Sequence, residues 1–241
     1  MHFASSTQME PEESLLPDRI SNLPSSLVQT ILTLMPIRDA FKTTILSRSW
    51  RHRCVNLPKL EFDQVQSVSC YLYVLHVLLL HQGPVLDFSL CVTQLPSCYE
   101  IDQIILHLAI KTTVEKFKLS MGLYISHKLP KSLFSLKKLT HLNLKNCVVE
   151  LPSTVFRFER LTSLSFHNVK ISTKMLISLL SCCPILNSFI LIQEEKQFMG
   201  TEYTNLVQLF QLMPLVDHLE MNYCPVNRVV IDEVKMLIEL L

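Results

Sequence analysis

Two neighbouring segments, residues 129–147 and 151–169, repeat one pattern and constrain the fold more than any other feature of this sequence. They align without a gap at an offset of 22 residues, and seven of their nineteen positions are identical. Each contains L-x-x-L-x-L or a close variant, as at Leu139/Leu142/Leu144. The x-L-x-L part predicts a short strand whose two leucines lie on one face. One strand cannot bury this face alone, so stacked parallel strands must bury it together.

The same frame recurs along most of the chain and predicts an extended row of strands. Its apolar positions are Leu57/Leu60/Phe62, Val85/Phe88/Leu90, Val114/Phe117/Leu119, Leu139/Leu142/Leu144, Leu161/Leu164/Phe166, Leu186/Phe189/Leu191 and Val216/Leu219/Met221. Residues 101–110 and 175–180 have the apolar spacing of helices. The expected fold class is α/β, with a curved parallel sheet and helical or irregular returns on its outer side. The alternative is ordinary strand–helix alternation in a closed α/β domain.

This pattern resembles a leucine-rich-repeat solenoid, in which units of about 20–29 residues stack on one another. Cys147 and Cys224 fall at the Asn/Cys position of the repeat. A small polar side chain at that position can bond the backbone of the turn. We therefore expect these two cysteines to bond the turns that follow their strands.

The composition argues against several classes of enzyme. The only glycines, Gly83, Gly122 and Gly200, are far apart, so no glycine-rich phosphate loop can form. The nine histidines show no metal-ligand spacing with cysteine or carboxylate. No nucleophile, base and acid can be combined without an arbitrary choice. We expect a non-catalytic protein without a metal or cofactor.

Several features predict a location in the cytoplasm or nucleus. The N-terminus lacks the basic and apolar regions of a secretory signal. The most lipid-like stretch, residues 71–80, is about half as long as a membrane-spanning helix and predicts a buried helix. The eight cysteines contain no C-x-x-C and predict buried reduced thiols. The net charge of +1 does not predict a nucleic-acid or membrane partner.

Residues 15–56 predict a module of short helices ahead of the repeats. Pro36 ends the first helix, Asp39 lies in the first turn of the second, and Ser47 can cap a third that holds Trp50. So small a unit cannot build a good core alone. Its apolar stripe should therefore meet something else, either the repeats or a second protein. The stripe consists of Leu27, Val28, Ile31, Leu32 and Leu34.

The landmarks of this module resemble an F-box, and more narrowly the F-box of plant F-box/leucine-rich-repeat proteins, many of which carry a further FBD region. The resemblance covers residues 15–62 closely and the repeats more loosely. In one departure, Ser25 and Ser26 stand where the family often has acidic residues. The matching landmarks are Asp18-Arg19-Ile20-Ser21, Leu23-Pro24, Ile31-Leu32, Pro36, Leu46-Ser47-Arg48 and Trp50-Arg51.

The resemblance implies that this module docks on the Skp-family adaptor of an SCF-type cullin–RING ubiquitin ligase, while the solenoid presents a protein substrate. Trp50 is the expected anchor of the contact, and the alternative for Trp50 is a role in the core of the module. A second hypothesis for the whole chain is a leucine-rich-repeat interaction scaffold without a ligase role. By matched position, the adaptor-facing residues would be Leu23, Pro24, Leu27, Ile31, Leu32, Leu34, Leu46, Ser47 and Trp50.

Strand alternation predicts which side chains lie on the concave face of the solenoid, where a substrate would bind. Each of them could instead be simply a solvent-facing strand residue. The outward positions are Lys116, Lys118, Ser120, His141, Asn143, Lys145, Ser163, Ser165, His167, Ser188, Ile190, Ile192, His218, Glu220 and Asn222. As substrate-binding residues we select Lys118, His141, Asn143, Lys145, Ser165, His167, Ile190 and Glu220.

A basic cluster overlaps this face. Eight lysines and one acidic residue, Glu115, lie between Lys111 and Lys145. The cluster could bind an acidic degron, a phosphopeptide or RNA. No aromatic side chains are interleaved with it as in a nucleic-acid site. A solvated surface is the simpler interpretation.

The predicted organisation has three parts. Residues 1–14 form a disordered tail, residues 15–56 the F-box, and residues 57–241 the solenoid. No complete FBD region follows the solenoid, and residues 229–241 read as an apolar helix at best. We therefore expect a truncated or divergent C-terminal end.

Overall fold

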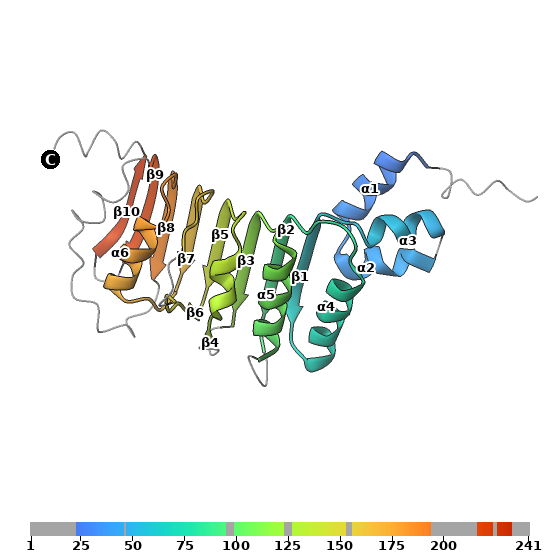
Figure 1. Ribbon diagram of the computed structural model, residues 1–241, viewed down its shortest axis with the longest axis horizontal. Coiled ribbons are helices and arrows are strands. Elements are labelled where there is room, and N and C mark those ends of the chain that lie inside the picture. Colours follow the sequence, from blue (N-terminus) through green and yellow to red (C-terminus); the bar gives the residue numbers. More distant parts are fainter. Residues whose placement is uncertain are drawn as a thin grey trace, which may run out of the picture.

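The structure is a computed structural model that describes most of the chain (Figure 1). N-terminal helices are followed by a long sheet with further helices along it. The predicted tail 1–14 and the predictions for Leu46 and Cys224 lie outside the described residues. The described residues are 23–45, 47–94, 99–122, 127–152, 156–193, 216–223 and 226–232.

The helices are α1 (Ser25–Leu34), α2 (Ile37–Lys42), α3 (Arg48–Cys54), α4 (Val68–Leu80), α5 (Tyr99–Lys111) and α6 (Thr173–Ser181), with the 3-10 helices η1 (Thr43–Ile45) and η2 (Lys131–Ser135). The strands are β1 (Lys59–Val65), β2 (Asp87–Val92), β3 (Lys116–Met121), β4 (His127–Lys128), β5 (His141–Lys145), β6 (Cys147–Val148), β7 (Ser163–His167), β8 (Ser188–Gln193), β9 (His218–Tyr223) and β10 (Val226–Asp232).

The main sheet has the strand order β1-β2-β3-β5-β7-β8-β9-β10, and β4 pairs with β6 in a small second sheet. Neighbouring strands from β1 to β9 are parallel. The predicted α/β fold, a helical module followed by a parallel sheet of stacked repeats, is therefore confirmed. The strands follow one another in sequence order, which distinguishes the sheet from that of a closed α/β domain.

Equivalent positions of the sequence repeat are paired across neighbouring strands, so the repeat pattern determines the register of this sheet. A one-residue slip would turn a whole strand's leucines to solvent. Full burial of one side chain of this size stabilises the fold by about 1.5–3 kcal/mol, so the pattern favours a single register. The first strand leucine, or its aromatic equivalent, pairs with the same position of the next strand and is buried at Leu60, Phe88, Phe117, Leu142, Leu164, Phe189 and Leu219.

Aromatic rings fill the core beneath the first three strands of the main sheet, β1, β2 and β3. Phe88 stacks on Phe117 with ring centroids 5.9 Å apart and an interplanar angle of 16°. Phe62 tilts against Phe88, also at 5.9 Å. Phe62 also meets Tyr73 of α4 edge-on at 6.3 Å. These rings join the sheet to the helix that covers it.

An asparagine, rather than a cysteine, bonds the turn after β5. Asn146 has a φ of 56°, in the left-handed region that asparagine tolerates better than most residues. Its Nδ2 donates a hydrogen bond to the carbonyl oxygen of Met121 at 2.6 Å and so links two repeats. Cys147 is buried, and its thiol makes no hydrogen bond within the described part of the chain. The bonding role predicted for Cys147 is wrong.

Helices α4, α5 and α6 lie along the same side of the sheet (Figure 1). Helices α5 and α6 confirm the predictions for residues 101–110 and 175–180. Helix α4 confirms the helix predicted at 71–80, although Leu72 and Leu79 are exposed and only one side of the helix is buried. None of the described helices is long and apolar enough to cross a membrane.

The two outer strands differ from the rest of the sheet. Strand β10 runs antiparallel to β9, which corrects the helix predicted for 229–241 over residues 229–232. The β-branched residues of this segment favour a strand. At the other end, β1 pairs only with β2 among the described strands. Its register shifts between Phe62 and Val65, where Gln64 has a φ of 56°.

Candidate protein-interaction surfaces

The N-terminal helices bury part of their apolar side chains in a core that is continuous with that of the repeats. Its buried members include Val28 and Leu32 of α1, Ala40 of α2, and Trp50 and Cys54 of α3. Because Val28 and Leu32 are four residues apart, they lie on the same side of α1. Helix α1 contacts α3 as well as α2. Burial raises the pKa of the Cys54 thiol to about 12, as expected of an apolar interior.

Two residues predicted to face the adaptor belong to this core. Leu32 is 1% exposed and Trp50 is 5% exposed, so neither side chain lies on the outer surface. Their assignment to the docking surface is wrong, and the alternative core role of Trp50 is confirmed. The apolar stripe of α1 spreads over two sides of the helix, and periodicity does not show which side the chain itself covers.

A second group of apolar side chains in these helices stays uncovered. Leu27 is 46% exposed, Leu34 is 82% exposed and Ile45 is 84% exposed. Leu23 and Ile31 are half-buried and pack against the edge of the core. The predicted outward surface therefore exists, with Leu27 and Leu34 as its most exposed predicted members.

The remaining predicted residues of this surface have separate roles. Pro24 is exposed and is the N-cap residue of α1. The hydroxyl of Ser47 accepts a hydrogen bond from the backbone nitrogen of Trp50 at 3.3 Å, which confirms the predicted cap of α3. Leu46 lies outside the described residues. The exposure of Ile45 was missed because the 3-10 helix η1 departs from the α-helical period that places apolar faces.

The main sheet presents its predicted outward side chains on one face, which we call the open face. Lys118, Asn143, Ser165, Ile190 and Glu220 are consecutive register partners across five strands. The structure thus brings the predicted substrate-binding residues together. The open face comprises Lys59, Glu61, Asp87, Ser89, Cys91, Lys116, Lys118, Ser120, His141, Asn143, Lys145, Ser163, Ser165, His167, Ser188, Ile190, Ile192, His218 and Glu220.

One predicted contact residue is not accessible on this face. Ser165 is only 6% exposed, and its hydroxyl lies 3.0 Å from Nε2 of His167. The prediction for Ser165 is wrong because the larger side chains around it cover a short serine. The other predicted contact residues have exposed or half-buried side chains: Lys118, His141, Asn143, Lys145, His167, Ile190 and Glu220.

Charge is unevenly distributed along the open face. The central strands β3, β5 and β7 place Lys116, Lys118 and Lys145 there and contribute no acidic side chain to it. Desolvation, and secondarily the charge of Lys116, lower the pKa of His141, so this ring is neutral at pH 7. The centre of the face is therefore basic through its lysines. The acidic residues of the face are Glu61 on β1, Asp87 on β2 and Glu220 on β9, and Asp87 is the register partner of Lys116.

Two family models match this sequence. A model of the F-box domain matches residues 20–62, which include α1, α2 and α3. A model described as FBD-associated F-box protein At5g56370, LRR repeats, matches residues 101–241, more than half of the chain. The chain belongs to this family of FBD-associated F-box proteins with leucine-rich repeats. The resemblance drawn from the sequence landmarks is confirmed.

Similar proteins of Arabidopsis thaliana carry the same combination of regions in their names. F-box/FBD/LRR-repeat protein At1g13570 is 32% identical over 205 residues, which cover 80% of this chain and 49% of that protein. Putative F-box/FBD/LRR-repeat protein At5g52460 is 36% identical over 179 residues, covering 70% of this chain and 44% of that protein. The chain thus spans about half the length of the curated relatives it matches.

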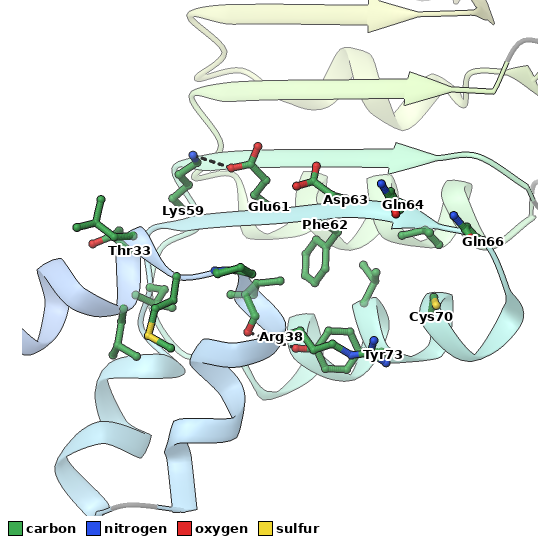
Figure 2. A pocket seen from close by; sticks show the side chains of 18 residues that line it. Thr33, Arg38, Lys59, Glu61, Phe62, Asp63, Gln64, Gln66, Cys70 and Tyr73 are labelled. Carbon is green, nitrogen blue, oxygen red and sulfur yellow. Dashed lines mark hydrogen bonds and ion pairs between the residues drawn. The ribbon is translucent and has the colours of Figure 1, made fainter.

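A pocket of about 730 Å³ lies where the F-box meets the first repeat (Figure 2). Its walls are residues 32–38 at the junction of α1 and α2, strand β1 and part of α4. Figure 2 shows Phe62 pointing from β1 toward Tyr73, and Lys59 paired with Glu61 at 2.7 Å. Within the described part of the chain, no group of three or more His, Cys, Asp or Glu side chains could hold a metal.

Cys70 of α4 lines this junction pocket. The hydroxyl of Ser67 caps α4 by accepting a hydrogen bond from the backbone nitrogen of Cys70, and it lies 3.3 Å from Cys70 Sγ. That hydroxyl is the main cause of a lowered pKa at the Cys70 thiol. The junction therefore holds a thiol of different reactivity from those in the core.

Helices α4 and α5 expose an apolar strip that the sequence patterns missed. Residues 68–80 are apolar on every side, so periodicity gives no direction to their burial. The exposed members of the strip include Leu72, Leu79, Leu106 and Ile110. Both helices lie along the same side of the repeat sheet (Figure 1).

Proposed function

We propose that this chain is a substrate-recruiting, non-catalytic subunit of an SCF-type cullin–RING ubiquitin ligase. The observation that carries the proposal is the uncovered surface of the F-box, where Leu34 and Ile45 are more than four-fifths exposed. Large apolar side chains gathered on short helices are typical of a protein-interaction site. A Skp-family adaptor would cover them, and a cullin would join the complex through that adaptor.

The open face of the repeat sheet is the substrate platform in this proposal. Its side chains come from parallel strands in fixed register, so their positions depend little on loops. An adaptor that positions its substrate for another enzyme needs no catalytic residues of its own. We place this activity in the cytoplasm or nucleus. The free state of the described cysteines, among them Cys54, Cys147 and Cys183, supports a reducing compartment.

Binding of the purified full chain to a purified Skp-family adaptor tests the first half of the proposal. We expect the double variant L27A/L34A to weaken the complex by at least tenfold, since removal of a central apolar contact costs about 2 kcal/mol. Gln29 lies on the same helix and is exposed, so Q29A is the matched control and should bind normally. Isothermal titration calorimetry measures both.

Absence of adaptor binding by the wild-type chain would overturn the proposal, and so would equal binding by L27A/L34A and wild type. Mass spectrometry of proteins captured in cells with ligase activity blocked tests the second half. Adaptor binding without any captured target would instead favour an interaction scaffold that lacks a ligase role.

A further inference from the structure

Four hydrogen-bond donors form a square in the middle of the open face. Lys118 and Ser120 of β3 align with Asn143 and Lys145 of β5 as register partners. Neighbouring strands lie about 4.8 Å apart, and alternate residues of one strand lie about 6.6 Å apart. These four side chains, which we call the donor quartet, therefore leave the sheet close enough for one small anion to contact several of them.

The donor quartet is not engaged elsewhere in the described part of the chain. The lysines that form ion pairs there are Lys42, Lys59 and Lys128. The side chains of Lys118 and Lys145 take part in none of these pairs and make no hydrogen bond within the described residues. The Cα atoms of the two lysines thus lie diagonally about 8 Å apart, and no residue between them in the quartet carries a carboxylate. A bound anion would relieve their repulsion.

We infer that the open face binds a phosphorylated peptide segment of the substrate and that the donor quartet holds its phosphate. A phosphorylated side chain carries a charge of about −1.5 to −2 and three strong acceptor oxygens. The two ammonium groups match that charge, and the four donor groups suffice for the three acceptor oxygens. A carboxylate would leave one lysine uncompensated. The inference rests on the proposed function, because it names the class of substrate for the proposed platform.

The surroundings of the quartet favour a peptide over RNA. Strands β3, β5 and β7 place no Phe, Tyr or Trp side chain on the open face, so bases would find none of the large stacking platforms typical of a single-stranded nucleic-acid site. Glu61 on β1, Asp87 on β2 and Glu220 on β9 lie on both sides of the quartet and would repel a continuous phosphate backbone. A single phosphate within a peptide avoids those carboxylates.

Fluorescence anisotropy with the full chain bound to its Skp-family adaptor tests the inference. The probe is a labelled pool of short peptides with a central phosphoserine and mixed flanking residues. The same pool with serine or glutamate at the centre provides two comparisons. We expect the phosphorylated pool to bind at least about tenfold more tightly than either, and K118A/K145A to remove about tenfold of that affinity.

Two variants make the result specific to the quartet. Lys137 and Lys138 are exposed in a turn away from the open face, so K137A/K138A removes the same charge and should bind within about twofold of wild type. K118R/K145R keeps the charge and the donors and should restore binding. Thermal unfolding of each variant shows whether the fold is retained.

Equal binding of the phosphorylated, serine and glutamate pools would overturn the inference. So would an equal loss of affinity in K118A/K145A and K137A/K138A. Tighter binding of a mixed-sequence single-stranded RNA than of the phosphorylated pool would do the same. Adaptor binding is measured on the same samples, so failure of the peptide with an intact adaptor complex rejects this inference alone. Failure of the wild-type adaptor complex itself rejects the proposed function.

Discussion

In the F-box, the most exposed apolar side chains are large, such as Leu34 and Ile45, whereas on the open face of the repeat sheet most side chains are charged or polar, such as Lys118 and Asn143. The difference comes from the period of each element. A strand separates its two faces completely, so every leucine can point inward. A short helix spreads its apolar residues over a wider arc, and a small module cannot cover them all. The F-box therefore leaves several of its large apolar side chains exposed. In the proposed function a second protein buries them.

Replacement of Phe88 by alanine should give the largest loss of stability. It tests whether the repeat sheet is stabilised by its own buried core. Phe88 is 0% exposed and lies against the rings of Phe62 and Phe117. We expect the free energy of unfolding to fall by about 4–5 kcal/mol, because the cavity is enclosed. Urea denaturation measures it. L34A should change stability by less than about 0.5 kcal/mol, and similar losses in both variants would break the comparison.

Replacement of Trp50 should give a somewhat smaller loss and separates core from contact within the F-box. We expect W50A to lower the free energy of unfolding by about 3 kcal/mol, because a buried aromatic ring is removed from a small core that can partly collapse. W50F keeps most of the ring and should bind the adaptor within about twofold of wild type. Weak adaptor binding by a stably folded W50F would restore Trp50 to the contact surface.

Loss of the Ser47 cap should cost less again. S47A removes the hydroxyl that accepts a hydrogen bond from the backbone nitrogen of Trp50, and we expect about 1 kcal/mol of destabilisation. S47D can still accept that bond and should retain stability. Ser49 is exposed within α3, so S49A is the control. Thermal unfolding compares the three variants, and an unchanged melting temperature in S47A would contradict the capping role.

Cysteine labelling probes the boundary between the two regions. Burial raises the pKa of Cys54 and of Cys147 to about 12, whereas Ser67 lowers the pKa of Cys70. Alkylation requires the thiolate, so between pH 7 and 9 the rate at Cys70 should rise earlier than that of a free cysteine. Cys54 and Cys147 should stay unlabelled. Peptide mass spectrometry reads each site.

The matched variant for this measurement is S67A. Without the hydroxyl, the pH at which Cys70 labelling is half-maximal should move upward, and the rate at pH 7 should fall a few-fold. Labelling of Cys147 at the rate of Cys70 would show that the repeats open more readily than their burial indicates.

The strands could be predicted because the leucine positions within each repeat define how its strand aligns with the next. Leu142 and Leu164 align in the sequence at an offset of 22 residues and pair directly in the sheet. The same frame placed β9 correctly from Leu219. A period-two pattern fixes which face is buried, and stacking fixes the neighbours. The rows of the open face, and the alignment of Lys118 with Asn143, follow from that register.

The errors arose where burial depends on packing rather than period. Leu32 and Leu34 both belong to the apolar stripe of α1, but only the tertiary contact with α3 shows that one is inside and the other outside. Ser165 occupies an outward position, and its cover comes from the size of its neighbours. Ile45 was missed for a local reason, since a 3-10 turn interrupts the helical period.

The irregular edge strand β1 affects whether two copies of this chain can pair edge to edge. An edge strand with unpaired backbone N–H and C=O groups can pair with an extended segment of any nearby chain. Such pairing is a common route to aggregation. In β1 the left-handed backbone at Gln64 and the register shift beside it interrupt that row of groups. An incoming segment could match only a few residues before its pairing failed. Two copies of this chain that meet at high local concentration would thus not aggregate through the edge of β1.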